Sequence, residues 1–411
     1  MDIISASDRA HLRKFRRNYS GGYYVIGRLG DPLFQVARAR TIWAAHTASA
    51  ADQLGLTSTL VVGRSELPFR LETQGSETNA DRILGDFYGI EGEVDLLVLN
   101  EIDRMQQEVP AAQDAAIRQL AQCARGQGFW HVRDPALARW CSRNGPAFLY
   151  EDHGEDYHDD ARPGISEVLN SPACRVVVAI TAEIAARLEA SGVHEEKIMV
   201  RPSASSLRRG VFTDRKISMC RDYHLRDGHQ RLIVYAGGLQ QERGISHILQ
   251  AAQRLPSYRF IIVGGHSVDR ESWQSEHPYG VLPNVCWTGY LPLPDTFLLE
   301  LSADLLLVTR EKSERAKISS PLKLFEYLRT GTPIVSYTIE IAEEYGQQDL
   351  ALVRYNSAEP DTLSSAIKTA LDNYPVVRGG YDQNILAGER CSWEWRLMQI
   401  IREINSRDAL A

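Results

Sequence analysis

Cysteine is scarce in this sequence. The 411 residues include six cysteines, and these are widely scattered: Cys123, Cys141, Cys174, Cys220, Cys286 and Cys391. No C-x-x-C pair and no histidine cluster accompanies them, which argues against a zinc site and against a disulfide framework. We therefore expect reduced thiols, no bound metal and a cytoplasmic location.

Long apolar runs are also missing. No segment reaches the ~18–20 apolar residues that a membrane span needs, and the N-terminal MDIISASDRAHLRKFRR has no apolar core or cleavage site of a signal peptide. We expect no transmembrane segment. Five cationic residues within residues 9–17 leave peripheral contact with an anionic surface open, although a solvated helix face is the simpler interpretation.

An excess of positive charge is absent as well. Lys plus Arg number 46 against 53 Asp plus Glu, and the resulting net charge of −7 argues against a nucleic-acid partner. An anionic ligand must then be held by a local basic set against a mildly repulsive background. The 44% hydrophobic and 24% charged fractions are typical of a folded chain, and the length predicts two to four domains, most simply two.

Short apolar, β-rich runs alternate with amphipathic helical stretches almost throughout the chain. This alternation predicts an α/β fold with parallel sheets and crossover helices. In the first half, the expected strands are 23–27, 58–62, 95–99, 129–132, 147–150 and 176–180. In the second half, they are 232–236, 260–263, 285–288, 305–308, 334–337 and 351–355.

The two halves predict two Rossmann-like, doubly wound parallel-sheet domains that face each other across a cleft, with ligands outside the carboxyl ends of the strands. The first domain ends near Arg201–Ser206, and we place the boundary between residues 210 and 211. The polar stretch up to about His229 shows no clear period and is interpreted as a linker. No G-x-G-x-x-G follows an expected strand, which disfavours a dinucleotide-dependent oxidoreductase.

The segment YAGGLQQERG, Tyr235–Gly244, follows an expected strand. Gly237 and Gly238 permit a tight turn and close approach of the backbone to a ligand. Arg243 and Gly244 precede a helix expected over 245–255, whose N-terminus offers free N–H groups and a partial positive charge. A diphosphate would suit this segment, but an ordinary strand–helix turn with a surface arginine explains it equally well.

The segment SSPLKLFEYLRTGTPIVS, Ser319–Ser336, predicts a helix with Pro321 in its first turn and Gly331 at its end. Lys323 and Glu326 then share one helical face. They form either a surface ion pair or a functional pair. In the second case the lysine meets phosphate oxygens and the carboxylate accepts two hydrogen bonds from a vicinal diol.

The segment FLYEDHGEDYHDD, Phe148–Asp160, places His153 three residues beyond an expected strand. A lone histidine in a loop is more often structural than functional. Here it lies among Glu151, Asp152 and Glu155, whose negative charge would raise its pKa. A metal site is a rival interpretation, but the spacing fits no known zinc or calcium pattern.

Taken together, these segments resemble the retaining family 4 (group 1) glycosyltransferases, which have the GT-B fold. The resemblance is carried by YAGGLQQERGISHILQAAQRLPSYRFIIVGG, PNVCWTGYLP, ADLLLVTR and SSPLKLFEYLRTGTPIVS, in the family's order. It implies an N-terminal acceptor domain over 1–210 and a nucleotide-sugar domain over 211–390. SWEWRLMQII, Ser392–Ile401, resembles the terminal helix that returns to the first domain, here 391–411.

The resemblance implies roles for four residues. In the family pattern G-R-L-x-x-x-K-G, the Arg and Lys bind the donor diphosphate; here Gly238 replaces the Arg and Arg243 stands at the Lys, so Lys323 is expected to supply the second cation. Glu326 matches the second glutamate of E-x7-E, which holds the ribose hydroxyls, whereas Ile318 stands at the first. His153 matches the histidine that contacts the donor sugar.

Further donor-binding positions follow from the same resemblance. They are Gly27, Gly30, Gly237, Gly238, Gly264, Gly265, Tyr290, Ser319, Ser320, Pro321 and Leu324. The Gly27–Asp31 loop resembles the loop that approaches donor phosphate and acceptor, and Gly264, Gly265 and the Tyr290 region resemble the nucleobase pocket. Backbone groups near Ser319 meet the donor sugar.

The implied activity is retaining transfer of a sugar from a nucleotide-diphosphate sugar to a hydroxyl of a glycan, a lipid-linked sugar or a natural product. UDP is the first expectation for the nucleotide, with GDP, ADP and dTDP open, and neither cofactor nor metal is required. The protein is expected as a monomer or homodimer. Two alternatives stay open: a GT-B nucleotide-sugar epimerase and a catalytically degenerate binding protein.

Overall fold

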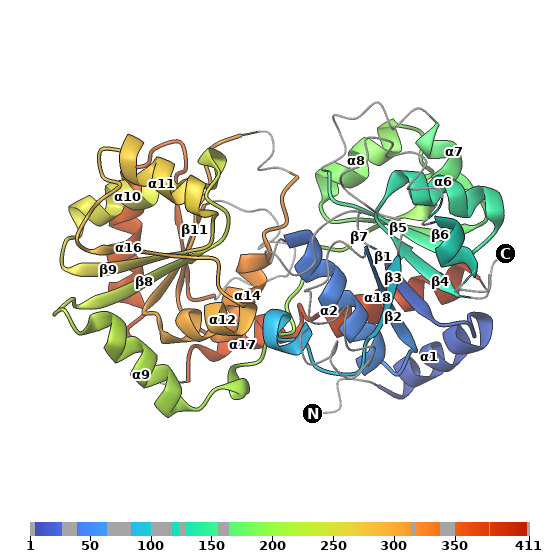
Figure 1. The fold of residues 1–411 in the computed structure, drawn as a ribbon, viewed down its shortest axis with the longest axis horizontal. Coiled ribbons are helices and arrows are strands. Elements are labelled where there is room, and N and C mark those ends of the chain that lie inside the picture. The colour runs from blue at the N-terminus through green and yellow to red at the C-terminus, as the bar shows by residue number, and fades with distance from the viewer. Residues whose placement is uncertain are drawn as a thin grey trace. The chain divides into compact units, whose positions relative to one another are not determined.

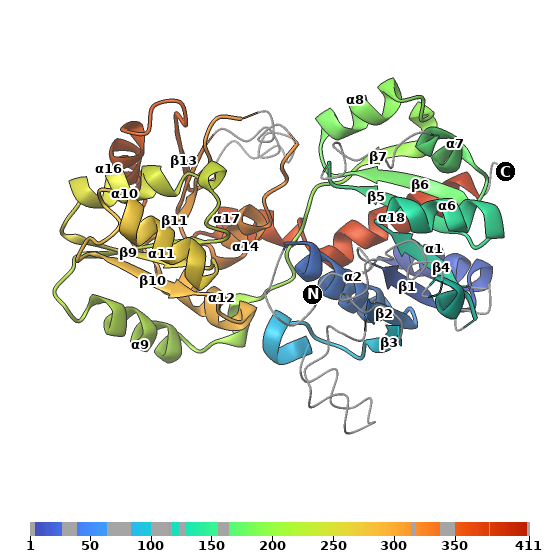
Figure 2. The ribbon, with the colours of Figure 1, turned by 45° about the horizontal axis from the view of Figure 1, so that its top comes forward.

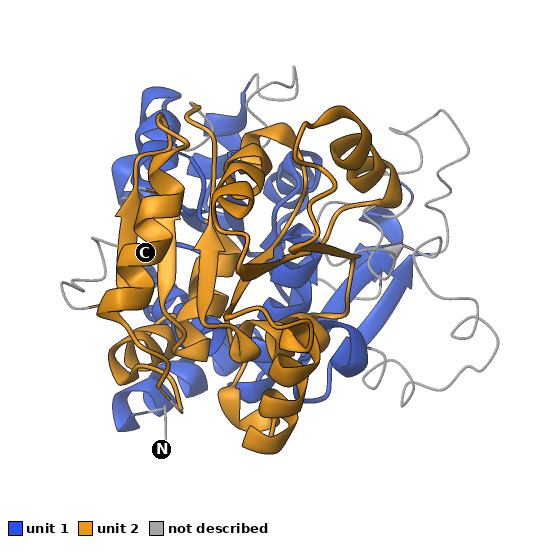
Figure 3. Ribbon diagram, turned by 90° about the vertical axis from the view of Figure 1, so that its left-hand side faces the viewer, with its two compact units in different colours: residues 1–203, 318–320, 392–411 blue, residues 204–317, 321–391 orange. Residues whose placement is uncertain are grey.

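The computed structural model describes residues 5–26, 39–63, 84–99, 115, 117–122, 128–154, 164–313, 318–337, 350–377 and 379–408. The chain forms two compact units (Figure 3). Unit 1 contains residues 1–203, 318–320 and 392–411, and unit 2 contains residues 204–317 and 321–391. None of the described helices combines the length and hydropathy of a membrane span.

Unit 1 is built on a parallel sheet with strand order β3-β2-β1-β4-β5-β6-β7. The strands are β1 (Tyr23–Ile26), β2 (Ser58–Gly63), β3 (Asp95–Leu99), β4 (Phe129–Val132), β5 (Phe148–Asp152), β6 (Cys174–Ala179) and β7 (Ile198–Val200). Six of them confirm the sequence prediction. The sequence did not predict β7, because its three half-buried residues are too few to show a pattern.

The helices of unit 1 include the first and the last helix of the described chain. They are α1 (Ala6–Asn18), α2 (Ala39–Gln53), α6 (Pro135–Asn144), α7 (Ile165–Asn170), α8 (Ala182–Ala190) and α18 (Trp393–Arg407). Helix α18, red in Figures 1 and 2, contacts α1, α2 and β6. Asp8 of α1 accepts a hydrogen bond from Arg402 of α18, while Leu12 and Phe15 are buried. The arginines of α1 are exposed, as the solvated-face interpretation predicts.

Unit 2 repeats this plan with strand order β10-β9-β8-β11-β12-β13, again all parallel. Its strands are β8 (Arg231–Ala236), β9 (Tyr258–Val263), β10 (Val285–Gly289), β11 (Leu305–Val308), β12 (Ile334–Tyr337) and β13 (Leu352–Tyr355). All six match the expected strands within two residues. The strand orders of both units confirm the prediction of Rossmann-like sheets.

Helices cover both faces of the second sheet (Figures 1 and 2), with α10 and α16 on one face and α9 and α12 on the other. The helices are α9 (Asp214–Leu225), α10 (Ile245–Arg254), α11 (Ser267–Glu276), α12 (Leu293–Ser302), α14 (Leu322–Thr330), α16 (Thr362–Asn373) and α17 (Asp382–Glu389). Leucine, isoleucine and valine side chains of the strands form the core against them.

The interpretation of residues 207–229 as a linker is wrong. Helix α9 lies within this stretch, with Thr213 accepting the Lys216 N–H at its N-terminus. Arg221 pairs with the buried Asp304, and Ile217 is the one residue that the helix buries. Ile217 is joined at the core only by the partly buried Cys220 and Leu225. Because this apolar face is narrow, the sequence shows no clear 3.6-residue period that would predict the helix.

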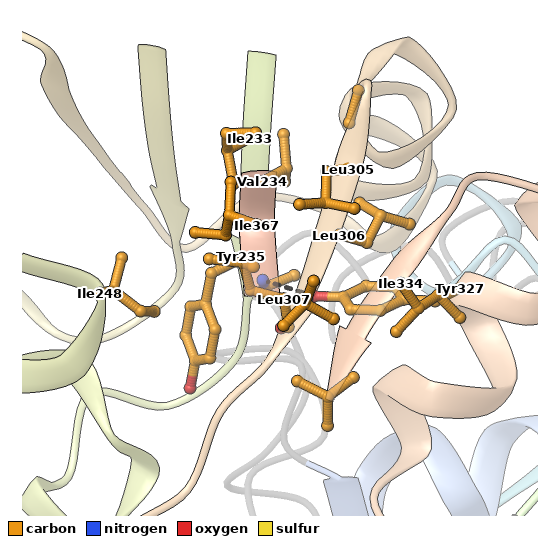
Figure 4. Packing of buried hydrophobic residues seen from close by; sticks show 14 of the residues in the cluster. Ile233, Val234, Tyr235, Ile248, Leu305, Leu306, Leu307, Tyr327, Ile334 and Ile367 are labelled. Carbon is orange, nitrogen blue, oxygen red and sulfur yellow. Dashed lines mark hydrogen bonds between the residues drawn. The ribbon is translucent and has the colours of Figure 1, made fainter. Parts of the chain in front are cut away.

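Strands β8 and β11 separate near their carboxyl ends, where the strand order of unit 2 reverses. Their pairing joins Leu305 to Ile233 and Leu306 to Val234. Beyond that point the Tyr327 hydroxyl bridges them (Figure 4), accepting the Ala236 N–H at 2.9 Å and donating to the Leu307 carbonyl at 3.4 Å. A side chain of α14 thus satisfies backbone groups that the diverging strands leave unpaired.

The Tyr327→Phe substitution tests this bridge. The phenyl ring keeps the packing but leaves the buried Ala236 N–H without its acceptor, so we expect a loss of about 1–2 kcal/mol in unfolding free energy. Urea unfolding followed by circular dichroism measures it. Tyr223→Phe, at a tyrosine that is 58% exposed, is the matched control and should change stability by less than about 0.5 kcal/mol. Equal midpoints for both variants would contradict the bridge.

Candidate functional site

The carboxyl end of β8 in unit 2 is built for close approach of backbone segments. Gly237 follows the strand and donates its N–H to the Val263 carbonyl at 2.9 Å. Gly264, at the end of β9, has φ +109°, and a Cβ on it would collide with the Gly237 carbonyl oxygen. A Cβ on Gly237 would lie 2.5 Å from Lys323 Nζ. The two glycines therefore let β8, β9 and the Lys323 ammonium meet at one point.

Two helices begin at this edge of the sheet without side-chain caps. Gly244, with φ +71°, precedes α10, and Pro321 precedes α14; neither N-terminus accepts a hydrogen bond from a capping side chain. The sequence predicts Pro321 within the first turn of α14, and the structure places it one position earlier, at the N-cap. A Cβ on Gly244 would lie 2.9 Å from the backbone nitrogen of Arg310. The absence of a side chain here therefore lets the N-terminus of α10 pack against the chain that follows β11.

Three cationic side chains gather at the same place. Lys323 Nζ is buried without a hydrogen-bond partner among the described residues and lies 3.7 Å from the centre of the Tyr235 ring. Burial, and then the positive charges of Arg243 and Arg310, hold the pKa of Lys323 well below its usual range. Burial also lowers the pKa of Arg310, and the positive charge of Arg243 lowers it further. The cations thus disfavour one another's charge, which a bound anion would relieve.

Arg310 is the member of this set that sequence analysis missed. It is 6% exposed and lies two residues beyond the end of β11, as Gly237 and Gly238 lie just beyond β8. Thr309 Oγ1 donates to the Arg243 carbonyl at 2.8 Å, which ties the two loops together. The signal in the sequence was the arginine that ends ADLLLVTR, directly after an apolar strand.

A pair of buried glutamates lies beside the cations. Glu326 of α14 is 6% exposed, and burial raises its pKa to about 7 against the opposing effect of Lys323. Glu300 of α12 is 1% exposed, and neither carboxyl oxygen has a hydrogen-bond partner among the described residues. Burial and the charge of Glu326 raise the pKa of Glu300 well above its usual range. The interpretation of Lys323 and Glu326 as a surface pair is therefore wrong.

Other expected donor-binding residues of unit 2 lie at the ends of β9 and β10. Gly265 has φ +77°, and the Gly264 N–H donates to the Gly289 carbonyl at 2.8 Å. The adjacent Tyr290 ring packs edge-on against His266 at 5.1 Å between centroids. Tyr235 Oη donates to the Gly238 carbonyl at 2.8 Å. The Leu324 side chain is 1% exposed within the core, so a ligand could meet this residue only through its backbone.

The serines expected near the donor sugar group with unit 1 rather than unit 2. Ser320 Oγ accepts the Ser203 N–H at 2.8 Å, and Ser203 Oγ donates to the Ser320 carbonyl at 3.1 Å. Ser319 lies between Ser320 and Ile318, whose side chain packs against the core of unit 1. Ile318, at the position where the family pattern has its first glutamate, is therefore an apolar residue in apolar surroundings.

In unit 1, His153 follows β5 and belongs to a buried polar network centred on Glu151. Glu151 Oε1 accepts from His153 Nε2 at 2.8 Å and from Arg396 Nη2 at 2.8 Å. Oε2 accepts from His131 Nε2 at 2.8 Å and from Arg396 Nη1 at 3.0 Å. His131 Nδ1 and Tyr23 Oη are 2.8 Å apart. Neither His131 nor Arg396 was among the predicted site residues; an arginine within the apolar stripe of SWEWRLMQII was the signal for Arg396.

Gly27, Gly30 and Glu155 lie outside the described residues. Among the described residues, no group of three or more His, Cys, Asp or Glu side chains is arranged to hold a metal ion. The five described cysteines are free thiols, three of them buried.

The raised pKa of Glu326 makes the ligand-free stability depend on pH. A carboxyl whose folded pKa exceeds its unfolded value stabilises the fold at low pH, and this contribution is lost as the pH rises through about 7. Glu326→Gln removes the ionisation, so its melting temperature should equal that of the wild type at pH 4, below the unfolded pKa of 4.5, and exceed it by at least ~2 °C at pH 8.

Thermal melting without ligand at both pH values measures this difference. Glu276→Gln, at an exposed position of α11, is the matched control and should melt with the wild type throughout. A Glu326→Gln variant that melts below the wild type at pH 8 would show that the carboxylate is stabilised rather than strained.

Comparison with known proteins gives the site its context. Residues 230–373 match the family described as Glycosyl transferases group 1. No curated protein matches the sequence. Among solved structures, Anabaena Alr3699/HepE in complex with UDP-glucose is 14% identical, with a TM-score of 0.66 over 95% of this chain and 99% of that chain.

Two further structures share this architecture. Sucrose-phosphate synthase from Thermosynechococcus elongatus is 13% identical, with a TM-score of 0.68 over 95% of this chain and 100% of that chain. WaaG, a glycosyltransferase involved in lipopolysaccharide biosynthesis, is 12% identical, with a TM-score of 0.59 over 92% and 98%. The two parallel-sheet units have the GT-B fold of these structures, and residues 230–373 in unit 2 match the family of group 1 glycosyltransferases.

Proposed function

We propose that this protein is a glycosyltransferase that moves a sugar from a nucleotide-diphosphate sugar to an acceptor hydroxyl with retention of the anomeric configuration. One observation carries the donor class: Arg243, Arg310 and Lys323 meet at two uncapped helix N-termini, at the point where the strand order of unit 2 reverses. Nucleotides bind at such points in open parallel sheets, and helix N-termini favour phosphate.

The cations of unit 2 would stabilise the leaving group. Breaking the glycosidic bond of the donor places negative charge on the terminal phosphate, and preorganised positive groups lower the barrier most when they need no reorganisation. Lys323 meets this condition, because its Nζ is held over the Tyr235 ring by packing and has no described partner to give up. Arg310 adds the positive charge that the family pattern places at position 238.

Glu326 would hold the ribose of the nucleotide. A carboxylate accepts two hydrogen bonds from vicinal hydroxyls only when it is ionised. Because burial raises the pKa of Glu326 to about 7 in the ligand-free protein, nucleotide binding must draw a proton off this group. We therefore expect nucleotide affinity to increase as the pH rises from 6 to 8.

UDP is the proposed nucleotide, supported by the UDP and UDP-glucose complexes of HepE, although that protein shares 14% identity with this chain. His153 of unit 1 is the proposed contact to the donor sugar. Retention needs no dedicated base if the leaving phosphate itself takes the proton of the acceptor hydroxyl, and we nominate none. Unit 1 would bind the acceptor, and the free thiols of the described residues are compatible with a cytoplasmic location.

A thermal-shift panel tests the donor class. A ligand that binds only the folded state raises the melting temperature by mass action. We expect UDP at millimolar concentration to raise it by more than ~3 °C, and GDP, ADP and dTDP to raise it less. Inorganic pyrophosphate controls for binding of anions alone. A flat response to all four nucleotides would overturn the proposal of a nucleotide-dependent transferase.

Substitutions in the cationic cluster test the catalytic assignment. Lys323→Ala and Glu326→Ala should each lower kcat/KM for the donor at least ~10²-fold, the scale of losing one preorganised electrostatic contact. Release of UDP in the presence of an acceptor extract measures turnover. Lys368→Ala, at an exposed position of α16, is the matched control and should retain full activity. Near-wild-type turnover in both site variants would exclude these residues from the site.

A further inference from the structure

The Glu151 carboxylate of unit 1 has no acceptor capacity left. An ionised carboxylate offers about four acceptor positions and no donor. Arg396 fills two of them with its two Nη groups, and His131 and His153 fill one each, all at 2.8–3.0 Å. Both side chains are almost fully excluded from solvent, 4% exposed for Arg396 and 0% for Glu151. Every hydrogen bond in this cluster therefore has a fixed direction.

That direction determines the protonation of the two imidazole rings. Burial alone would raise the pKa of Glu151, but Arg396 and the two histidines hold it well below its usual range. Because the carboxylate can only accept, each histidine must donate through Nε2. His131 is then the Nε2–H tautomer, and its Nδ1 accepts the Tyr23 hydroxyl proton at 2.8 Å. His153 is likewise protonated on Nε2, with its Nδ1 edge turned away from Glu151.

Arg396 is itself fixed by the backbone. Its Nε donates to the Pro202 carbonyl at 2.6 Å, and Nη2 also donates to the Arg201 carbonyl at 3.1 Å. The planar guanidinium therefore holds one orientation, and its two Nη groups hold both carboxylate oxygens in turn. On the other side, the Trp43 ring packs edge-on against His153, with centroids 5.7 Å apart. The imidazole is restrained by a hydrogen bond and by packing.

We propose that Glu151 and Arg396 are positioning residues, which fix the ring orientation and the Nε2–H tautomer of His153 for contact with the donor sugar. This inference rests on the proposed function. It gives α18 a role beyond packing, because one arginine near the end of the chain determines the state of a ring that follows β5. Neither Glu151 nor Arg396 need touch the substrate.

A double-mutant cycle separates positioning from a structural role. Arg396→Lys keeps the charge but cannot hold both carboxylate oxygens, so we expect kcat to fall ~10–100-fold, the scale seen for residues that orient metal-ligating histidines. In a His153→Ala background the same change should cost less than ~3-fold, because there is no ring left to orient. Equal costs in both backgrounds would overturn the proposal.

Arg402→Met is the matched control for this cycle. Arg402 lies on the same helix and donates to Asp8 of α1, so its loss perturbs α18 without reaching the Glu151 network. We expect kcat within ~2-fold of the wild type. A loss as large as that of Arg396→Lys would show that general disturbance of α18 explains the effect, and would overturn the positioning role.

A second measurement is independent of turnover and of whether Arg396→Lys folds. In wild-type protein labelled with ¹⁵N-histidine, the ring nitrogens report the tautomer directly, and the His153→Ala variant assigns the signal. We expect His153 to be protonated on Nε2, and a neutral ring protonated on Nδ1 would overturn the proposal. If no sugar nucleotide is turned over, the proposed function fails, while this spectrum still decides the arrangement around Glu151.

Discussion

The separation of β8 from β11 is the constraint on which the donor site of unit 2 depends. Right-handed crossovers send the chain to opposite sides of the sheet from these two strands, so their carboxyl ends open a space between the loops that follow. At this point the Tyr327 hydroxyl hydrogen-bonds to the backbone groups that the separated strands leave unpaired. Helix α14 carries Tyr327 as well as Lys323 and Glu326. The same element therefore satisfies the backbone between the two strands and supplies charged side chains to the site.

The cost of this arrangement is buried charge. Lys323, Glu300 and Glu326 are held where burial disfavours their ionised forms, and no described group satisfies the Lys323 ammonium or the Glu300 carboxyl. Strained electrostatics of this kind are characteristic of sites that bind or transform a charged ligand. Unit 1 shows the opposite case, a buried charge that is fully compensated. The carboxylate of Glu151 accepts hydrogen bonds from Arg396 and two histidines, and the positive charge of Arg396 balances its negative charge.

Much of the fold was predictable from the sequence because parallel strands buried on both faces leave continuous apolar runs. That signal identified twelve of the thirteen described strands, and failed only at the three-residue β7. Helix α9 was missed for a related reason: it buries only Ile217 fully, so its apolar face is narrow and gives a weak periodic signal. The residues Gly237, Arg243, Lys323 and Glu326 were identified by motif, and their convergence follows from the positions of their elements.

The sequence by itself determined the α/β class, the elements that supply the donor site and the family resemblance, because these depend on local periodicity and on residues close together in the chain. Only the tertiary structure decided which side chains are buried and which pair with which. Arg310 joins the cations because β11 lies next to β8, and Arg396 reaches Glu151 across 245 positions because α18 packs into unit 1. Burial and pairing between distant residues determine the charge states of these side chains, and a local sequence pattern predicts neither.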